Sequence, residues 1–181
     1  YIDEAENFKD QLNIFSLNYP RDFSPGEFDV ENAASVIESI QIGTELCLKK
    51  KVSAMVTGPI NKSILRIKGF KFSGHTDYLE YLCECEKDTA TMMMINRYLK
   101  IIPLTIHEPL GQVSSKIKEQ VIGNKITLII SEIKKYFQSI PKIAVLGFNP
   151  HAGEDGQIGS EEILEIVPAI SKFQRNKNCI V

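Results

Sequence analysis

The sequence contains no tryptophan and almost no excess of charge of either sign. Its 181 residues include 21 lysine and arginine residues against 23 aspartate and glutamate residues, a formal net charge of −2. This charge balance lacks the excess of basic residues that is typical of nucleic-acid-binding proteins, so we expect no nucleic-acid partner. No uninterrupted apolar run reaches the roughly 18–20 residues that cross a bilayer, so we expect no membrane partner. An apolar fraction of 43% instead indicates a globular protein and excludes the disordered and collagen-like classes.

Cysteine is also scarce, with Cys47, Cys83, Cys85 and Cys179 the only four. This is too sparse for a small protein held together by disulfides. The Cys83-Glu-Cys85 pair lacks the two-residue gap of zinc knuckles and redox motifs. We therefore predict reduced thiols in a cytoplasmic protein.

Helix-type and strand-type apolar patterns alternate along the chain. Spacings of three and four residues predict helices over 30–51, 62–68 and 125–137, with another after 160, and Asn61 is placed to cap the second. Shorter apolar runs predict strands over 52–57, 91–95, 99–106 and 142–148. This alternation predicts an α/β fold around a largely parallel sheet over 30–181, and the proline- and glycine-containing stretch 1–29 is predicted to be a loop-rich approach segment.

The three histidines all fall in loops where predicted strands end or helices begin. In open α/β sheets ligands bind at that edge. His107 ends the run Pro103–His107, and His151 follows the strand over 142–148. Two neutral imidazoles suit zinc or cobalt, although a catalytic zinc normally has three protein ligands and no third histidine is evident. Each histidine could instead be a surface or capping residue.

Two other turns have binding chemistry. Gly74-His75-Thr76 precedes a helix, where free backbone N–H groups, a hydroxyl and an imidazole suit a phosphate or carboxylate. The alternative is that Thr76 caps the helix with no ligand. Lys62 begins the helix that follows the turn Thr57-Gly58-Pro59. Neither this turn nor the glycine-rich loop 149–160 matches a Walker or Rossmann motif, so a nicotinamide cofactor would bind without a standard Rossmann loop.

These motifs occur in an order that resembles one family. Val56–Lys62, Ser73–Thr76, Ile106-His107 and Leu146–Gly156 are similar to segments of the PdxA family, the 4-hydroxythreonine-4-phosphate dehydrogenases, as are Ser24–Glu27 and Gly159–Glu162. The resemblance runs from about residue 24 to about residue 172. It implies a three-layer α/β/α fold like that of isocitrate and isopropylmalate dehydrogenases. This fold would be incomplete in a chain truncated at both ends, because the family's first strand should precede Tyr1 and its third metal histidine should follow Val181.

The resemblance also implies a reaction. It would be NAD- or NADP-dependent oxidation of 4-phosphooxy-L-threonine, followed by decarboxylation to 3-amino-2-oxopropyl phosphate, in pyridoxal 5′-phosphate (vitamin B6) biosynthesis. His107 and His151 match two of the family's metal-binding histidines, for zinc, magnesium or cobalt, and His75 and Thr76 match its substrate-binding pair. Lys62 would be a polar neighbour of the site, and the catalytic base is unassigned. The family implies a homodimer whose active sites draw on both subunits.

Three alternatives stay open. The protein could be a paralogous dehydrogenase of another 4-phosphorylated hydroxy acid, or an inactive fragment that keeps the phosphate site and part of the metal site. An acyl-phosphate transferase on a related fold is the third, although two histidines in a metal-site context argue against it.

Overall fold

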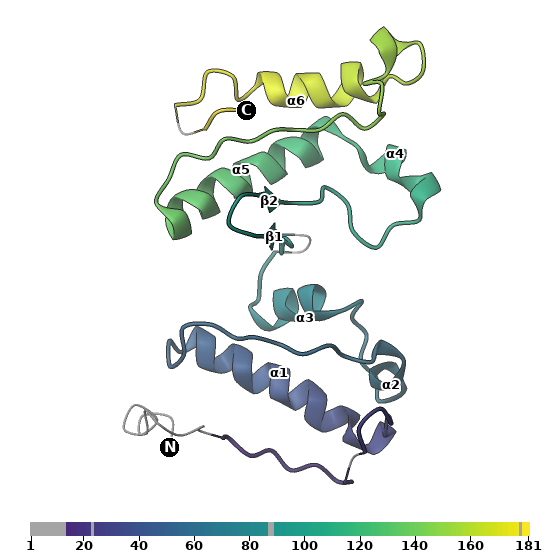
Figure 1. Ribbon diagram of the computed structural model, residues 1–181, viewed down its shortest axis with the longest axis vertical. Helices are drawn as coiled ribbons and strands as arrows, with labels where there is room; N and C mark the ends of the chain where they lie inside the picture. Colours follow the sequence, from purple (N-terminus) through teal and green to yellow (C-terminus); the bar gives the residue numbers. More distant parts are fainter. Residues whose placement is uncertain (1–13, 23, 87–88, 178) are drawn as a thin grey trace. The chain divides into compact units, whose positions relative to one another are not determined.

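The computed structural model describes residues 14–22, 24–86, 89–177 and 179–181 (Figure 1). The chain divides into two compact units, Tyr1–Met92 and Met93–Val181, which are described separately below. The predicted approach segment lies outside the described residues over 1–13 and at residue 23. The boundary predicted at residue 29 stays a prediction.

The first unit is built from helices around an aromatic core. Its elements are η2 (Val30–Asn32), α1 (Ala33–Leu48), α2 (Lys62–Ile67) and α3 (His75–Leu82). Both α2 and α3 pack against α1. Three rings, those of Phe70, Phe72 and Tyr78, pack with centroids 4.9–5.2 Å apart beside buried Leu65. Burial of these apolar side chains joins the two short helices, which could not persist in isolation, to α1.

Short polar side chains set where these helices begin. The Asn61 side chain accepts a hydrogen bond from the backbone N–H of Ile64 at 3.2 Å, which confirms the predicted cap of α2. Asn32 binds both the N–H and the carbonyl of Arg21, at 3.1 and 2.9 Å. The Ser35 hydroxyl donates to the Asn18 carbonyl at 2.8 Å. These bonds hold the end of the approach segment against the start of α1.

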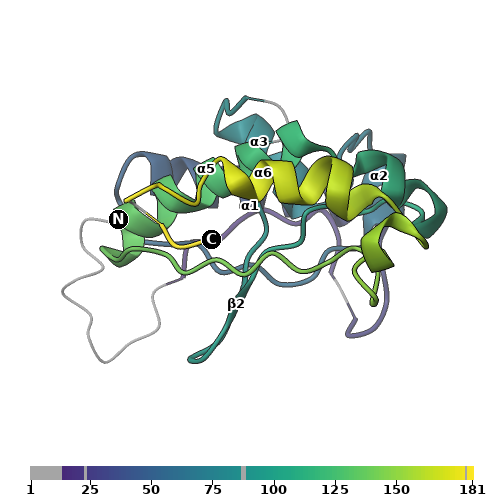
Figure 2. The ribbon, with the colours of Figure 1, turned by 90° about the horizontal axis from the view of Figure 1, so that it is seen from above.

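The second unit begins with a hairpin and continues as packed helices. Its elements are β1 (Met94–Ile95), β2 (Lys100–Ile101), η3 (Leu110–Gln112), α4 (Val113–Lys116), α5 (Glu119–Phe137), η4 (Glu154–Gly156), η5 (Glu162–Ile166) and α6 (Val167–Ser171). β1 and β2 pair antiparallel, and Figure 2 shows the hairpin extending away from α5 and α6. The core lies between α5 and the η5–α6 helix, where Ile122, Ile126, Ile166 and Ala169 are buried. η5 is a π-helical turn just before Pro168, whose missing N–H interrupts the α-helical bonding pattern.

Glu165 on η5 supplies the cap that α5 lacks locally. Lys118, the N-cap residue, makes no side-chain capping bond. Instead, one Glu165 oxygen accepts the backbone N–H of Glu119 at 2.7 Å, and the other accepts the Lys118 ammonium at 2.8 Å. The Lys118 hydrogen bond, followed by the Glu119 N–H, lowers the pKa of Glu165 below its ordinary value of 4.5. A carboxylate at a helix N-terminus also complements the helix dipole.

The predicted strands form much less ladder than the sequence indicates. Within the described residues, hydrogen-bonded pairing is limited to β1–β2 and one parallel bridge between Lys142 and Ile180. The predicted largely parallel sheet is therefore wrong for this part of the chain. The segment 142–148 nonetheless alternates as a strand does, because Ile143 and Val145 pack on the α5–α6 core while Leu146 is exposed. A ladder needs an adjacent strand, and no described segment other than residue 180 supplies one there.

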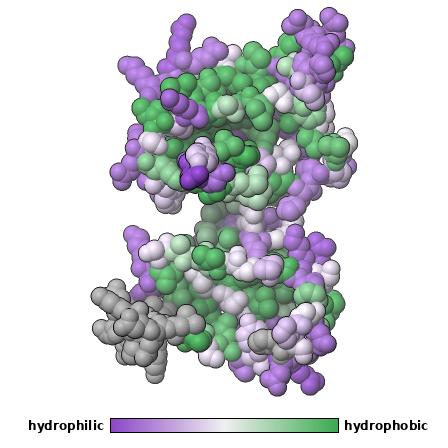
Figure 3. Space-filling view, viewed as in Figure 1, coloured by the Kyte–Doolittle hydropathy of each residue, from purple (hydrophilic) through white to green (hydrophobic). Residues whose placement is uncertain are grey.

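Apolar side chains reach the surface in both units (Figure 3). Val56 is 96% exposed and Leu146 is 82% exposed, and both lie on segments predicted to be strands. No described helix combines the length and the apolar character needed to cross a bilayer. All four cysteines are free thiols, as predicted.

Candidate functional site

In the first unit, the structure brings Lys62 against the start of α3. Gly74 is the N-cap of α3, and it makes no side-chain capping bond. A Cβ at Gly74 would lie 3.5 Å from Lys62 Cε and 3.6 Å from Lys62 Nζ. These are ordinary contact distances, and they place the ammonium group beside the first turn of the helix. A positive charge next to helix N–H groups makes this place suitable for an anion.

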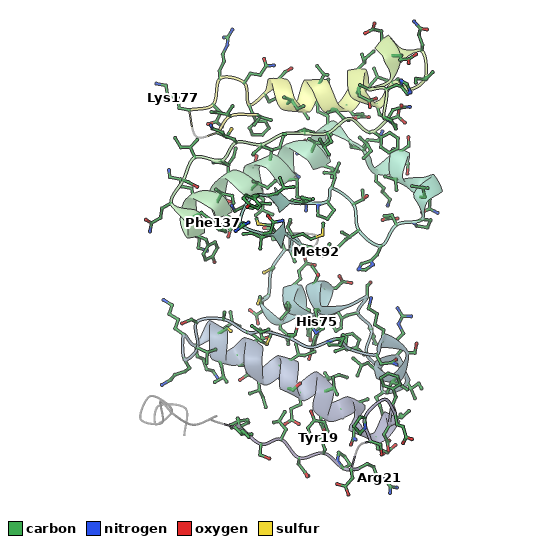
Figure 4. The ribbon with its side chains drawn as sticks, in the orientation of Figure 1. Tyr19, Arg21, His75, Met92, Phe137 and Lys177 are labelled. Atoms are coloured by element: carbon green, nitrogen blue, oxygen red, sulfur yellow. The ribbon has the colours of Figure 1, made fainter. Side chains whose placement is uncertain are left out.

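His75 adds an unsatisfied polar atom to the same place. Its Nε2 is buried and has no hydrogen-bond partner among the described residues (Figure 4). Buried polar atoms are nearly always paired, so this nitrogen, one residue after Gly74, is an unused hydrogen-bonding group that a ligand could satisfy. The turn is fixed from the other side, where Asp77 accepts the backbone N–H of Ser73 at 3.0 Å. The alternative in which Thr76 caps the helix is wrong, because the cap is Gly74.

In the second unit, a carboxylate orients the imidazole of His151. The His151 Nδ1 atom lies 3.0 Å from an oxygen of Glu154, and the His151 N–H donates to the side-chain oxygen of Asn149 at 2.9 Å. In metal-binding histidines, the ring nitrogen that does not bind the metal typically donates its N–H to a carboxylate in this way. The structure therefore gives His151 a carboxylate partner within its own loop.

Strained backbone occurs at one predicted metal histidine and directly after the other. His107 has a φ of +59°. Five consecutive residues after His151, from 152 to 156, also have positive φ, at +50°, +77°, +42°, +53° and +89°. Ala152, Glu154 and Asp155 are not glycine, and each costs about 1–2 kcal/mol in this conformation. Strain of this kind persists only where surrounding contacts hold it, and it gathers at functional sites.

The predicted site residues thus fall into two groups. Lys62, His75 and Thr76 lie together in the first unit, whereas exposed His107 and His151 belong to the second. No cluster of three or more histidine, cysteine, aspartate or glutamate side chains suited to a metal occurs in the described part of the chain. Sequence analysis missed Glu154, although its position three residues after His151 in a glycine-rich loop was a usable signal.

Comparison with solved structures defines the class of protein. The chain superimposes on a 4-hydroxythreonine-4-phosphate dehydrogenase from Klebsiella pneumoniae with a TM-score of 0.72 and 27% identity, covering 91% of this chain and 50% of that one. The dehydrogenase of that description from Burkholderia phymatum gives a TM-score of 0.68 at 28% identity, covering 90% of this chain and 49% of the other. This confirms the predicted α/β class, with a fold that is incomplete within this chain.

Sequence comparison identifies the family. Curated 4-hydroxythreonine-4-phosphate dehydrogenases from Hydrogenobaculum sp. and Saccharophagus degradans are 46% and 36% identical to it, over 93% and 86% of this chain. The family described as pyridoxal phosphate biosynthetic protein PdxA matches residues 2–181, and the chain belongs to this family. It spans about half the length of these relatives, 53% and 46% respectively.

Proposed function

We propose that the protein acts as a 4-hydroxythreonine-4-phosphate dehydrogenase in vitamin B6 biosynthesis. It would oxidise 4-phosphooxy-L-threonine with NAD or NADP, and the oxidised product would lose CO2 to give 3-amino-2-oxopropyl phosphate. The observation that carries the proposal is the site formed by Lys62, His75 and the start of α3 in a chain of this family. A phosphorylated hydroxy acid is the anionic ligand that this site suits.

Each group at this site has a separate part in substrate binding. The Lys62 ammonium neutralises an anionic oxygen, and the first-turn N–H groups of α3 donate to the same or a neighbouring oxygen. His75 Nε2 donates when it carries the proton, and the Thr76 hydroxyl offers a further donor. Gly74 brings the backbone at the start of α3 within contact distance of the Lys62 side chain. Together these residues bind and orient the substrate.

His107 and His151 would hold a divalent metal ion. The donor chemistry fits zinc or cobalt better than magnesium, because imidazole is a borderline ligand and magnesium prefers oxygen. The Glu154 contact on His151 Nδ1 supports this role. A complete metal centre needs a third protein ligand. The described residues contain no group of three candidate ligands, so the third would come from outside them. When bound, such an ion acts as a Lewis acid toward the alcohol and ketone oxygens.

We also propose a cytoplasmic homodimer with active sites shared between subunits. The free cysteines support a reducing compartment. The β1–β2 hairpin supports association, because Met94, Ile95 and Ile101 are 47–56% exposed on it. Light scattering on the purified full-length protein tests the subunit number.

The enzymatic test follows the near-ultraviolet absorbance of NADH or NADPH with 4-phosphooxy-L-threonine and added divalent metal. We expect turnover that a chelator abolishes. Lys62→Ala should raise KM about 10- to 100-fold, the loss expected for one hydrogen bond to a charged group. The exposed Lys71→Ala is the matched control and should leave KM unchanged.

Three results would count against the proposal. Turnover with another 4-phosphorylated hydroxy acid in preference to this substrate would indicate a paralogous activity. Absence of turnover with every such acid would refute the dehydrogenase assignment. An unchanged KM in Lys62→Ala would remove Lys62 from the substrate site.

A further inference from the structure

Glu162 is a buried carboxylate with no part in the site described so far. It is the first residue of η5, and only 7% of it is exposed. Its Oε1 accepts the backbone N–H of Asn149 at 2.9 Å. Its Oε2 is buried with no hydrogen-bond partner among the described residues. A buried carboxylate is costly unless its contacts repay the lost hydration, so its position calls for a specific role.

The carboxylate lies directly beneath the backbone of the loop that carries His151. A Cβ at Gly153 would lie 3.0 Å from Glu162 Oε2, and a Cβ at Gly147 would lie 3.4 Å from Oε1. Two glycines on either side of Asn149 and His151 therefore approach this one side chain closely. At Gly153 the backbone is also close to the Gly159 carbonyl, 2.7 Å from such a Cβ, so a larger residue there would shift the loop.

A continuous chain of hydrogen bonds leads from Glu162 to His151. Glu162 holds the N–H of Asn149, and the Asn149 side-chain oxygen holds the N–H of His151 at 2.9 Å. The Asn149 amide also donates to the Ile158 carbonyl at 3.3 Å, which closes the loop on itself. Glu162 thus holds Asn149 in place, and Asn149 in turn bonds to the residues before and after the strained left-handed turn, His151 and Ile158.

We propose that Glu162 is a positioning residue that holds the 149–160 loop so that His151 is presented to the metal. The inference rests on the proposed metal role of His151 and deepens it. Glu162 acts through Asn149, because within the described residues its hydrogen bond goes to the Asn149 N–H and not to the imidazole. Its neighbour on the same helix, Glu165, instead binds Lys118 and Glu119 at the start of α5. Glu165 is therefore a matched control that lies on the same element but holds a different part of the unit.

The test uses two measurements on the full-length protein and four variants: Glu162→Ala, Glu162→Gln, Glu165→Ala and, for metal binding, His151→Ala. The first measurement is amide hydrogen exchange of the peptide covering 149–160. Glu162→Ala should speed exchange there about 10- to 100-fold, because it removes the acceptor that anchors Asn149. Glu162→Gln keeps an acceptor oxygen and should restore most of the protection. Glu165→Ala should leave this peptide unchanged.

The second measurement is Co2+ binding, followed by the visible absorption of the bound ion. Glu162→Ala should weaken binding about 10- to 100-fold, the usual effect of losing a group that orients a metal ligand. Glu162→Gln should bind nearly as the unaltered protein does, and His151→Ala supplies the reference for a lost ligand.

The two measurements separate the positioning role from the proposed function. Exchange in Glu162→Ala that is unchanged over 149–160, or raised equally throughout the second unit, would overturn the positioning role. So would Co2+ binding unaffected by Glu162→Ala in a protein whose binding His151→Ala does weaken. Co2+ binding that His151→Ala leaves unchanged would instead refute the metal role of His151, and the exchange result would still decide the role of Glu162 in the loop.

Discussion

Replacing Gly153 by alanine tests whether the loop that carries His151 depends on close backbone packing. Gly153 has a φ of +77°, so a side chain there costs about 1–2 kcal/mol before any contact is considered. The new Cβ would lie 2.7 Å from the carbonyl oxygen of Gly159 and 3.0 Å from a carboxylate oxygen of Glu162. The nearer atom belongs to the backbone and cannot rotate away, which adds about 1–3 kcal/mol of overpacking. The lower entropy of the unfolded alanine variant returns about 0.4–1 kcal/mol.

We therefore expect Gly153→Ala to lower the free energy of unfolding by about 2–4 kcal/mol. Gly156→Ala is the matched control, because Gly156 has a similar φ of +89° and its nearest neighbour is the flexible end of Ile163 at 3.3 Å. The control should cost only about 1 kcal/mol. Urea unfolding followed by far-ultraviolet circular dichroism measures both variants. Equal losses would refute the reasoning, because they would show that backbone conformation alone matters and that contacts of the new Cβ with Gly159 and Glu162 add no cost.

Three further changes test other parts of the fold. Asn61→Ala should cost about 1 kcal/mol of stability by removing the cap on the Ile64 N–H, whereas Asn61→Ser should cost much less, and thermal or urea unfolding separates them. Ile126→Ala should cost about 2–5 kcal/mol because Ile126 is 2% exposed between α5 and α6; a loss under about 1 kcal/mol would contradict that packing. The pKa of Glu165 is lowered below its ordinary value of 4.5, chiefly by the hydrogen bond from Lys118. The contribution of Glu165 to folding stability is therefore fully present above pH 4.5 and is lost as the pH falls through the lowered pKa of the folded protein. Glu165→Gln should therefore be less stable than the unaltered protein at neutral pH, and unfolding curves should converge in acid; a pH-independent difference would exclude this linkage.

Local signals predicted the helices well, and they placed strands on both sides of the turn at Asn96. Asn61 caps α2 as expected, and Asn96 closes the turn between β1 and β2 through its side chain and the N–H groups of Tyr98 and Leu99. These features depend on residues three or four positions apart, so the sequence contains them directly. The start of α5 was missed, since the helix begins at Glu119 and not near residue 125. Its cap comes from Glu165, 46 residues further along, and no local pattern reports such a contact.

The strands were overpredicted because strand pairing, like the cap of α5, depends on residues far away in the sequence. An apolar run such as 142–148 identifies a segment suited to a sheet, but the ladder depends on a neighbour that the run does not specify. Ile143 and Val145 do pack inward, so the pattern correctly indicated which side chains face the core. Pairing reaches only Lys142, where residue 180 lies alongside.

The site shows how the sequence can indicate residue types without indicating what holds them. The histidines and Lys62 were identifiable from their places at the ends of predicted elements. The approach of Lys62 to Gly74 was not, because it depends on the packing of α2 and α3 against α1. The left-handed conformation of Ala152, Glu154 and Asp155 was also hidden, because these residues rarely adopt it. Only Gly153 and Gly156 marked that turn in the sequence.

The strained turn and the buried carboxylate account for each other. Three non-glycine residues in the left-handed region cost several kcal/mol in total, at about 1–2 kcal/mol each, and a free loop would relax. Relaxation would carry Glu154 away from His151 Nδ1, because both side chains are exposed and nothing but the backbone keeps them 3.0 Å apart. Glu162 opposes this relaxation, because its carboxylate accepts the Asn149 N–H and packs against Gly153. An apolar residue at 162 could fill the same space, but it could not accept the Asn149 N–H, which would then be left without its partner. Burial of the Glu162 carboxylate is therefore explained by the loop conformation that it stabilises, and that conformation keeps the His151 imidazole next to Glu154.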